Sequence, residues 1–362
     1  MLGISIYPEK QDKDEIMKYL DLAAKYNFKR VFSCLLSVEK SKEEVIKEFS
    51  EINEYAHKKG LIVILDVNPR VFSTFGASYD DLTFFKSLKA DGIRLDMGFD
   101  GKKEANMTFN EQNLMIEINI SNENKYLDNI LSYKPNKNML IASHNFYPQK
   151  YTGLSLDFFT NITKKFHDNH IKTAAFVTSK FANVGPWKLS HGLCSLEILR
   201  DKSITAQTKF LYATRLIDDI IIGDSFASEA ELKAMSEINS EIITFKLDKN
   251  SLKKNTEIEN TILFDNHHFR RGDTNDYSAR STMSRVKYKN ETFKPHSTPE
   301  ILEVGDVVIC NENYGQYKGE LQIILKRQDN IELGKNVVGK IVKEELDLLN
   351  YLYALERFKF EK

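Results

Sequence analysis

Short apolar runs alternate with amphipathic stretches over the first 226 residues of the chain. The apolar runs lie at residues 2–8, 30–37, 61–69, 92–98, 114–121, 139–148, 171–179 and 216–226. Between most of them apolar residues recur three and four apart, as at Ile16, Leu20 and Ala23, which is the period of a helix with one buried face. Eight strands that alternate with helices predict an α/β fold, a closed parallel (β/α)8 TIM barrel.

An open doubly wound sheet is the alternative architecture for this pattern. Such a sheet normally carries a glycine-rich turn after its first strand. The sequence Tyr7-Pro8-Glu9 stands at that point instead, so we favour the barrel.

Local signals mark several helix ends. Ser41 and Glu44 have the spacing of a capping box, and Gly60 is placed to end the helix that they begin. Another helix is expected to begin at Ser78, because acidic residues follow it closely. The stretch 99–113 is polar and rich in asparagine, which predicts a degenerate helix after the fourth strand.

The pattern changes at about residue 241. Strand-like runs at 242–247, 258–264, 303–310, 320–325 and 336–340 are separated by turns rich in Asn, Gly and Lys, and a helix is expected over 344–357. We therefore predict a barrel domain over 1–240 and a second, mostly β domain over 241–362.

Charge and cysteine content narrow the functional classes. The 51 basic and 52 acidic residues leave a formal charge of −1, whereas non-specific nucleic-acid binding draws on a basic excess. The cysteines Cys34, Cys194 and Cys310 are far apart, so neither a disulfide framework nor a zinc knuckle is expected. The N-terminus lacks a signal-peptide pattern and no apolar run is long enough for a membrane helix. These features predict a cytoplasmic protein without nucleic-acid or membrane partners.

Polar residues stand at the ends of the predicted strands, where barrel enzymes of this type carry their chemistry. They are Tyr7, Asp66, Arg94, Asp96, Glu117, Asn119, Asn145 and Asp224. Arg94 and Asp96 are two residues apart on one strand, so they share a face, and Ile93 and Leu95 occupy the other. We expect the charged pair to face the mouth of the barrel.

Structural explanations exist for each of these carboxylates. Glu117 could form an internal salt bridge with Arg94, Asp66 and Asp224 could cap turns, and Asp96 could cap the end of its own strand. If the carboxylates instead converge, their repulsion would raise the pKa of one of them enough for it to act as an acid at neutral pH.

Three chemistries fit such a mouth. A glycosidase needs two carboxylates across an oxocarbenium-like transition state. A metal site could use Asp66, Asp96, Glu117 and His144, but no HxH or HExxH spacing supports it. A Schiff-base aldolase could use Lys180, which is one lysine among many.

The segment that follows the seventh strand is long and holds the chain's single tryptophan, Trp187. An ordered loop at a barrel mouth often forms a subsite wall, and an aromatic ring suits the face of a sugar; core packing is the alternative. Glu197, in the same segment, is a further candidate acid or binding residue, or a surface residue.

Four arginines lie within sixteen residues of the second domain. Arg270, Arg271, Arg280 and Arg285 are interleaved with glycine and serine, which suits a phosphate or carboxylate ligand. The alternative is a solvated loop whose arginines pair with nearby aspartates.

These features together resemble a known family. The segments that carry the resemblance are GISIYP, ILDVNP, IRLDMGF, EINISN, HNFYP, HGLCSLEILR, IIGDSFAS and RRGDTNDYSARS, in this order along the chain. The chain resembles the MupG-type 6-phospho-N-acetylmuramidases over essentially its whole length.

The resemblance implies a TIM barrel with a cyclophilin-like β domain and no metal or organic cofactor. It implies hydrolysis of the β-1,4 bond of 6-phospho-N-acetylmuramyl-N-acetylglucosamine inside the cell, during peptidoglycan recycling. The phosphate and lactyl carboxylate of that substrate would account for Arg270, Arg271 and Arg280. A phosphosugar isomerase or lyase and a non-catalytic binder of anionic sugars are the alternatives.

Two analogies bear on the catalytic residues. The fourth strand resembles the nucleophile strand of α-amylase-type barrels, which would make Asp96 the nucleophile and Glu117 the acid/base. It departs from the chitinase pattern DGxDxDxE, since Arg94 replaces the second aspartate of that pattern and Gly98 replaces the glutamate. Asp224 is a third catalytic candidate, and either Asp66 or Asp224 could orient the substrate's 2-acetamido group.

Overall fold

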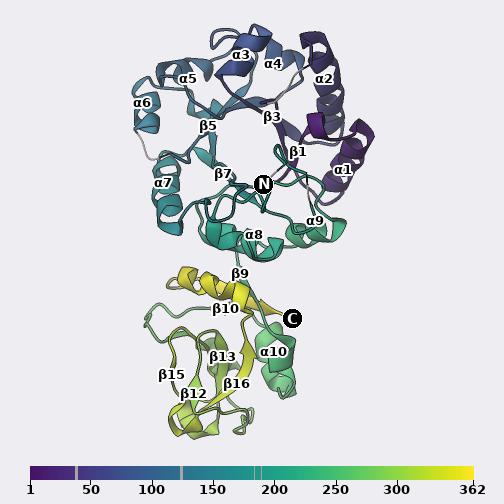
Figure 1. Cartoon of the computed structure of the whole chain (residues 1–362). Helices are drawn as coiled ribbons and strands as arrows, with labels where there is room; N and C mark the ends of the chain where they lie inside the picture. Colours follow the sequence, from purple (N-terminus) through teal and green to yellow (C-terminus); the bar gives the residue numbers. More distant parts are fainter. Residues whose placement is uncertain (37–39, 123–124, 183, 189) are drawn as a thin grey trace. The chain divides into compact units, whose positions relative to one another are not determined.

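The N-terminal part of the chain is a closed barrel of eight parallel strands (Figure 1). The computed structural model describes residues 1–36, 40–122, 125–182, 184–188 and 190–362. The strands are β1 (Leu2–Ile6), β2 (Arg30–Cys34), β3 (Ile62–Val67), β4 (Gly92–Leu95), β5 (Met115–Asn119), β6 (Leu140–Ser143), β7 (Lys172–Val177) and β8 (Asp219–Ile222). β1 pairs in parallel with both β2 and β8, which closes the ring. The barrel prediction is therefore confirmed over the open sheet.

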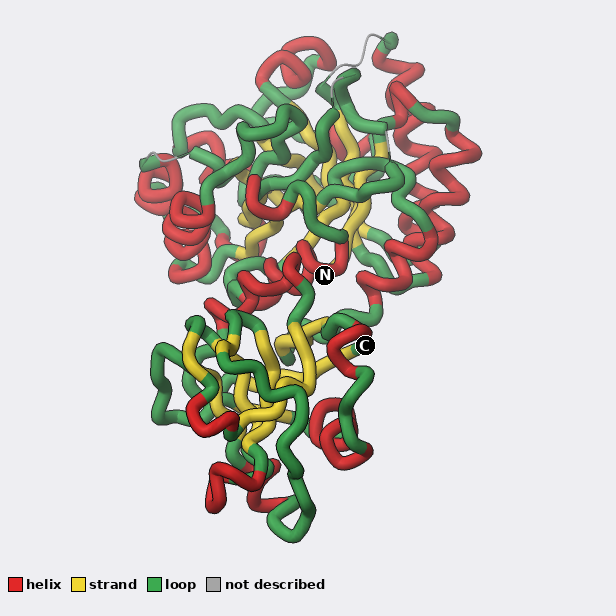
Figure 2. The backbone as a smooth tube through the Cα atoms, turned by 60° about the horizontal axis from the view of Figure 1, so that its bottom comes forward, coloured by secondary structure: helices red, strands yellow, loops and turns green. Residues whose placement is uncertain are grey.

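Helices surround the barrel on its outer side, as Figures 1 and 2 show. They are α1 (Lys13–Lys25), α2 (Lys42–Lys58), α3 (Pro69–Phe75), α4 (Thr83–Ser87), α5 (Lys102–Met107), α6 (Tyr126–Ser132), α7 (Leu156–Asp168), α8 (Ile204–Ala213) and α9 (Glu229–Ser236). The predicted capping box of Ser41 and Glu44 opens α2. Gly60 follows its end with a left-handed φ of 75°, which glycine adopts without strain.

The predicted helix start at Ser78 is wrong. The Ser78 hydroxyl accepts hydrogen bonds from the amides of Asp80 and Asp81, and the backbones of Ser78 and Asp81 bond to each other in a tight turn. The chain instead forms α3 before this turn, capped by the Asn68 side chain, and the short α4 after it. In the polar stretch 99–113 the structure has only the six-residue α5.

The described residues form two compact units, Met1–Ile238 and Asn239–Lys362. The second unit is mostly β, as predicted. Its strands are β9 (Ile243–Lys246), β10 (His268–Phe269), β11 (Ser278–Ser281), β12 (Ile301–Leu302), β13 (Asp306–Cys310), β14 (Leu321–Ile324), β15 (Gln328–Asp329), β16 (Lys335–Lys340) and β17 (Arg357–Glu361). They form sheets in the orders β10–β17–β9, β11–β14–β13–β16 and β12–β15.

Two elements of this unit differ from the prediction. The expected strand at 258–264 is helix α10 (Glu257–Phe264), because Thr256 and Glu259 form a capping box and Ile262 and Leu263 are buried one turn later. The expected helix at 344–357 is a 3-10 helix over Lys343–Tyr351, after which β17 pairs in parallel with β9. A further short helix, α11 (Met283–Lys287), follows β11.

Candidate active site

A cavity of about 240 Å³ opens at the carboxyl ends of the barrel strands. Its lining residues are Leu36, Asp66, Arg94, Asp96, Asn145, Phe146, Phe176 and Trp187. Each lies in the second half of a strand or in the segment that follows one, which is where barrel enzymes place their chemistry. The cavity brings together four of the predicted site residues, namely Asp66, Arg94, Asp96 and Asn145.

Arg94 donates hydrogen bonds to the other polar residues that line the cavity. Its Nη1 donates to Asp66 Oδ1 at 2.6 Å and to Asp96 Oδ1 at 3.3 Å. Its Nη2 donates to Asn145 Oδ1 at 2.5 Å, and its Nε donates to Ser143 Oγ at 2.7 Å. The guanidinium is buried, so these bonds fix its plane and hold the two carboxylates beside each other.

The two aspartates occupy different surroundings. The Asp66 side chain is 5% exposed, and burial raises its pKa to about 7 although the Arg94 guanidinium opposes the shift. The Asp96 side chain is 35% exposed, so it faces solvent through the cavity. One carboxyl group is thus suited to carry a proton near neutral pH, while the other faces the space that a ligand would fill.

The two carboxyl groups are close enough to act on one bond. Because Asp66 Oδ1 and Asp96 Oδ1 contact the same Arg94 nitrogen, they lie no more than about 6 Å apart, which is less than the ~6.5–9.5 Å that separates the carboxyl groups of inverting glycosidases.

Aromatic rings also line the cavity. The Trp187 ring lies edge-on to Phe146 at 5.9 Å between centroids, and Phe146 lies edge-on to Phe176 at 5.0 Å. Trp187 is 51% exposed, so its ring is not part of the packed core. The predicted position of Trp187 at the mouth is confirmed, and an exposed ring in the same cavity as paired carboxylates suits a sugar.

Two predicted binding residues, Asn119 and Tyr7, donate hydrogen bonds to backbone carbonyls at the ends of barrel strands. Asn119 Nδ2 donates to the Asp96 carbonyl oxygen at 3.1 Å and thereby holds the backbone at the end of β4. The Tyr7 hydroxyl is buried and donates to the Gly223 carbonyl oxygen at 2.6 Å. Neither side chain lines the cavity.

Asp224 is buried beside the end of β7. It accepts hydrogen bonds from Thr178 Oγ1 at 2.6 Å and from the Ser179 amide at 3.2 Å. Burial raises its pKa to about 6 against these hydrogen bonds. Asp224 does not line the cavity, and its contacts match the capping alternative.

Glu117 lies in the barrel interior, below the cavity lining. It is fully buried and forms a salt bridge with Arg30 of β2, which also donates to Asp219 of β8 at 2.7 Å. The internal salt bridge expected for Glu117 therefore exists, but its partner is Arg30 and not Arg94.

Glu197 holds its own segment together. It forms two hydrogen bonds with Arg200, at 2.8 and 2.7 Å, and accepts from the amides of Tyr151 and Gly153. The hydrogen bonds from Arg200 hold the pKa of Glu197 at about 2. This carboxylate is thus fully engaged away from the cavity.

Of the residues that the metal and Schiff-base alternatives would use, Asp66 and Asp96 line the cavity, but Glu117, His144 and Lys180 do not. His144 is buried with its ring nitrogens against Ser121 and Thr163, and burial lowers its pKa to about 3. Lys180 is exposed, and its amide donates to Glu231.

The predicted arginine cluster of the second unit is divided. Arg270 donates to the carbonyl oxygens of Leu352 and Asn275, and Arg271 forms a bidentate pair with Asp273. Arg280 projects from β11 instead and pairs with a buried glutamate. The solvated-loop alternative thus describes Arg271, while Arg280 lies in different surroundings.

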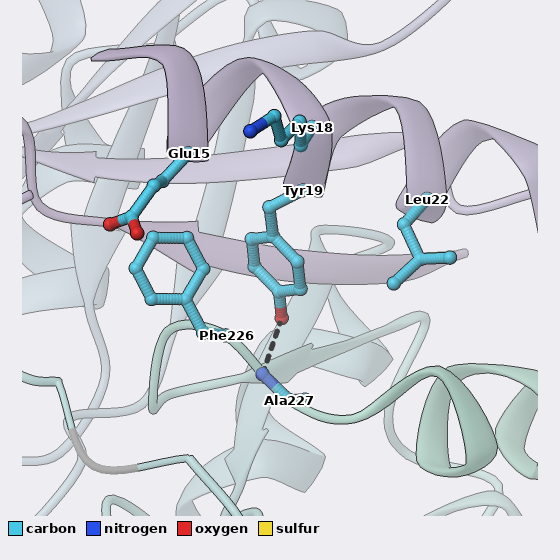
Figure 3. A pocket seen from close by; sticks show the side chains of 6 residues that line it. All are labelled: Glu15, Lys18, Tyr19, Leu22, Phe226 and Ala227. Atoms are coloured by element: carbon cyan, nitrogen blue, oxygen red, sulfur yellow. Dashed lines mark hydrogen bonds between the residues drawn. The ribbon is translucent and has the colours of Figure 1, made fainter. Parts of the chain in front are cut away.

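A second pocket, of about 350 Å³, lies between α1 and the segment after β8 (Figure 3). Its lining consists of Glu15, Lys18, Tyr19, Leu22, Phe226 and Ala227. The Ala227 amide donates to the Tyr19 hydroxyl at 3.2 Å. With one carboxylate in its lining, this pocket does not offer the paired acids of the barrel mouth.

Two family models cover nearly the whole chain. One is described as "6-phospho-N-acetylmuramidase, N-terminal" and matches residues 2–237; the other is described as "6-phospho-N-acetylmuramidase, C-terminal" and matches residues 245–361. The chain belongs to the 6-phospho-N-acetylmuramidase family. It is accordingly a glycosidase, as the sequence predicted.

Two solved structures are similar to this chain over its whole length. A crystal structure of an uncharacterized B. cereus protein is 46% identical, with a TM-score of 0.92, and covers 100% of this chain and 99% of its own. A conserved protein of unknown function from Enterococcus faecalis is 22% identical, with a TM-score of 0.73 over 100% and 96% of the two chains, which shows the shared fold. A search of curated proteins found no match. Among the described residues of this 6-phospho-N-acetylmuramidase family member, no helix has the length and apolarity that crossing a membrane requires.

Sequence reasoning missed part of the glycosidase's cavity. Leu36, Phe146 and Phe176 line it, and Ser143 orients Arg94, but none of the four was proposed. Phe146 lies in the HNFYP segment after β6 and could have been found by its position. Phe176 could not, because an apolar residue inside a strand is indistinguishable from core.

Proposed function

We propose that this glycosidase hydrolyses the β-1,4 bond of 6-phospho-N-acetylmuramyl-N-acetylglucosamine. The products are N-acetylmuramic acid 6-phosphate and N-acetylglucosamine, released in the cytoplasm during peptidoglycan recycling. The family supports the reaction class, and the observation that carries the site is the pair Asp66 and Asp96 on one Arg94 nitrogen.

The two aspartates divide the work in this proposal. Protonated Asp66 donates its proton to the glycosidic oxygen, and the Asp96 carboxylate attacks the anomeric carbon as the bond to the leaving sugar breaks. Water, deprotonated by Asp66, then attacks the same carbon and releases Asp96. The close spacing of the carboxyl groups supports this retaining route.

Arg94 and the aromatic wall have positioning roles. Arg94 keeps the carboxyl groups together while their charges change, and Trp187 offers its face to a sugar ring. We assign Glu117 and Asp224, the other catalytic candidates from the sequence, to the support of this constellation, since both are buried outside the cavity lining.

The variant Asp96→Asn tests the proposal. With the phosphorylated disaccharide as substrate, we expect kcat to fall at least about 10²-fold, because an amide cannot replace the carboxylate as nucleophile. Asp100→Asn is the matched control, because Asp100 is exposed in the segment after the same strand. Wild-type turnover in Asp96→Asn would remove Asp96 from the mechanism.

The products separate hydrolysis from the alternative reactions. Hydrolysis adds one water and gives two intact sugars, whereas a lyase gives an unsaturated sugar and an isomerase leaves the mass unchanged. Mass spectrometry of the wild-type reaction distinguishes these outcomes. Anomer-resolved NMR of the first product should show retention, and inversion would contradict the role of Asp96 as nucleophile.

A further inference from the structure

One face of the four-stranded sheet in the second unit gathers charged side chains. In its antiparallel ladder Arg280 of β11 is opposite Gln322 of β14, and Cys310 of β13 is opposite Lys335 of β16. Gln322 is also opposite Val308, which lies two residues before Cys310. Directly opposed residues and alternate residues share a face, so Arg280, Gln322, Cys310 and Lys335 lie on the same side of the sheet.

A single buried carboxylate lies among these side chains. Glu320 is fully buried and accepts from Arg280 Nε at 2.7 Å and Nη2 at 3.1 Å, and from Gln322 Nε2 at 2.9 Å. Arg285 of α11 lies 3.6 Å from the same carboxylate. Burial opposes ionisation of Glu320, but the hydrogen bonds from Arg280 and Gln322 hold its pKa below the usual range.

Lys335 is the member of the cluster whose charge no described residue neutralises by direct contact. The residue is 8% exposed, and its Nζ makes no hydrogen bond or ion pair with any residue that the structure describes. Burial lowers the pKa of Lys335, while the charge of Glu320 favours its ammonium form from beyond ion-pair distance. A buried ammonium without a partner is costly, and lysine rarely occupies such a position unless something neutralises it.

Arg280 and Arg285 also have N–H donors that no described residue accepts. Arg280 uses Nε and Nη2 for Glu320, which leaves Nη1 without a hydrogen bond among the described residues, and Arg285 has only its longer contact. Both guanidinium groups lie over the Tyr317 ring, at 5.9 and 5.1 Å from its centroid, which fixes their orientation.

We propose that Arg280, Arg285 and Lys335 form a binding site for a phosphate monoester. Three cations around one carboxylate leave a net charge of +2. A phosphate monoester carries about −1.5 to −2 near neutral pH, so it matches this charge more closely than a carboxylate does. Arg270 and Arg271 are engaged by backbone carbonyls and by Asp273, so they take no part in it.

Phosphate binding at this site does not depend on the reaction in the barrel, so a direct binding experiment tests it. Isothermal titration of the full chain with inorganic phosphate should show one site, which acetate occupies more weakly. Lys335→Met should weaken phosphate binding at least about tenfold, since a hydrogen bond to a charged group is worth that much. Lys335→Arg retains the charge and should bind within about threefold of the wild type.

Lys326→Met is the matched control. Lys326 also belongs to the second unit, but it is exposed and pairs with exposed Asp276, so its removal should leave phosphate binding unchanged. Circular dichroism checks that each variant is folded. Equal phosphate affinity in the wild type and Lys335→Met would overturn the proposal, as would acetate binding that equals phosphate binding or the loss of binding in Lys335→Arg.

Two sources could supply the phosphate group: the barrel's own phosphorylated substrate or a separate phosphorylated metabolite. Competition between inorganic phosphate and the phosphorylated disaccharide, both titrated into Asp96→Asn, distinguishes them. Loss of phosphate binding identifies the substrate as the source, and retained binding identifies a separate ligand. Either result rests on a site that the Lys335 variants have already established.

Discussion

Asp66 and Asp96 carry the same functional group, but the barrel places them in different environments. Asp66 is buried at the end of β3 and Asp96 faces the cavity after β4. The contrast follows from backbone position: the strand still packs on its neighbours at residue 66, whereas residue 96 lies just beyond the last ladder pair. Two chemical roles thus arise from one residue type.

The variant Asp66→Asn should remove the alkaline limb of the pH profile. In the wild type kcat is expected to fall as the pH rises through about 7, because the proton that Asp66 donates is then lost. An amide cannot donate that proton, so the residual rate of the variant should be about 10²- to 10⁴-fold lower and independent of pH in this range. Initial rates between pH 5 and 9 measure both effects.

The same substitution should change how stability depends on pH. The unfolded chain releases the Asp66 proton near pH 4, whereas the folded protein retains it to about 7. The stability that this group contributes is therefore fully present below pH 4 and is lost as the pH rises through 7. Urea unfolding at several pH values should show a smaller decline for Asp66→Asn, and an equal decline would contradict the assigned pKa.

Glu117 is expected to matter for stability more than for catalysis. Glu117→Gln removes the charge that neutralises Arg30 inside the barrel, and the loss of one partner of a buried pair costs about 3–5 kcal/mol when the other charge stays behind. Denaturant titration measures this loss. For the fraction that remains folded we expect a kcat within about threefold of the wild type, since a positioning role is not part of the chemical step.

A fall of 10²-fold or more in kcat of folded Glu117→Gln would restore this residue to the mechanism.

The sequence alone could not decide which arginine pairs with Glu117. Alternation along β4 predicted that Arg94 and Asp96 share a face, but Arg30, at the start of β2, carries no local sign that it reaches Glu117. Such a contact depends on the radius and stagger of the closed barrel.

At the scale of elements, the segment between β7 and α8 is seated on the end of β8. A Cβ on Gly223 would lie 2.3 Å from the Leu193 carbonyl oxygen and 2.7 Å from the Leu193 Cβ. Glycine at this position is therefore what lets the segment that carries Trp187 lie against the strand.

Gly223→Ala should displace that segment. We expect the free energy of unfolding to fall by about 1–3 kcal/mol, as for other overpacked sites, and KM to rise because Trp187 moves with its segment. Thermal unfolding and steady-state kinetics measure the two effects. Gly272→Ala is the control, since its Cβ would meet only Leu355, at 3.7 Å; equal behaviour of the two variants would contradict the packing argument.

Helix ends were predictable where capping residues mark them, as at Ser41, because the capping interaction spans only three residues. The capping box of Thr256 and Glu259 carries the same signal, and it distinguishes α10 from the strand that the apolar run after it also fits. Short apolar runs fit either element, so the cap is the observation that decides between them.

At the scale of the whole molecule, the barrel follows from the number and order of its elements. Each parallel strand pairs with the next one along the chain, as the alternation predicts, and the sequence Tyr7-Pro8-Glu9 after β1 favours the closed barrel over an open sheet. The second unit differs in this respect. β17, near the end of the chain, lies between β9 and β10, and no local pattern specifies a pairing over such a separation.

The position of the chain's single tryptophan gives the enzyme an optical reporter. Trp187 is half exposed in the wall of the cavity, so a sugar that covers its ring removes water from the one indole in the molecule. Emission excited at the red edge of the absorption band, where tyrosine does not absorb, would then shift toward the blue as the cavity fills. Occupancy of the active site could thus be followed in real time without a label and without turnover.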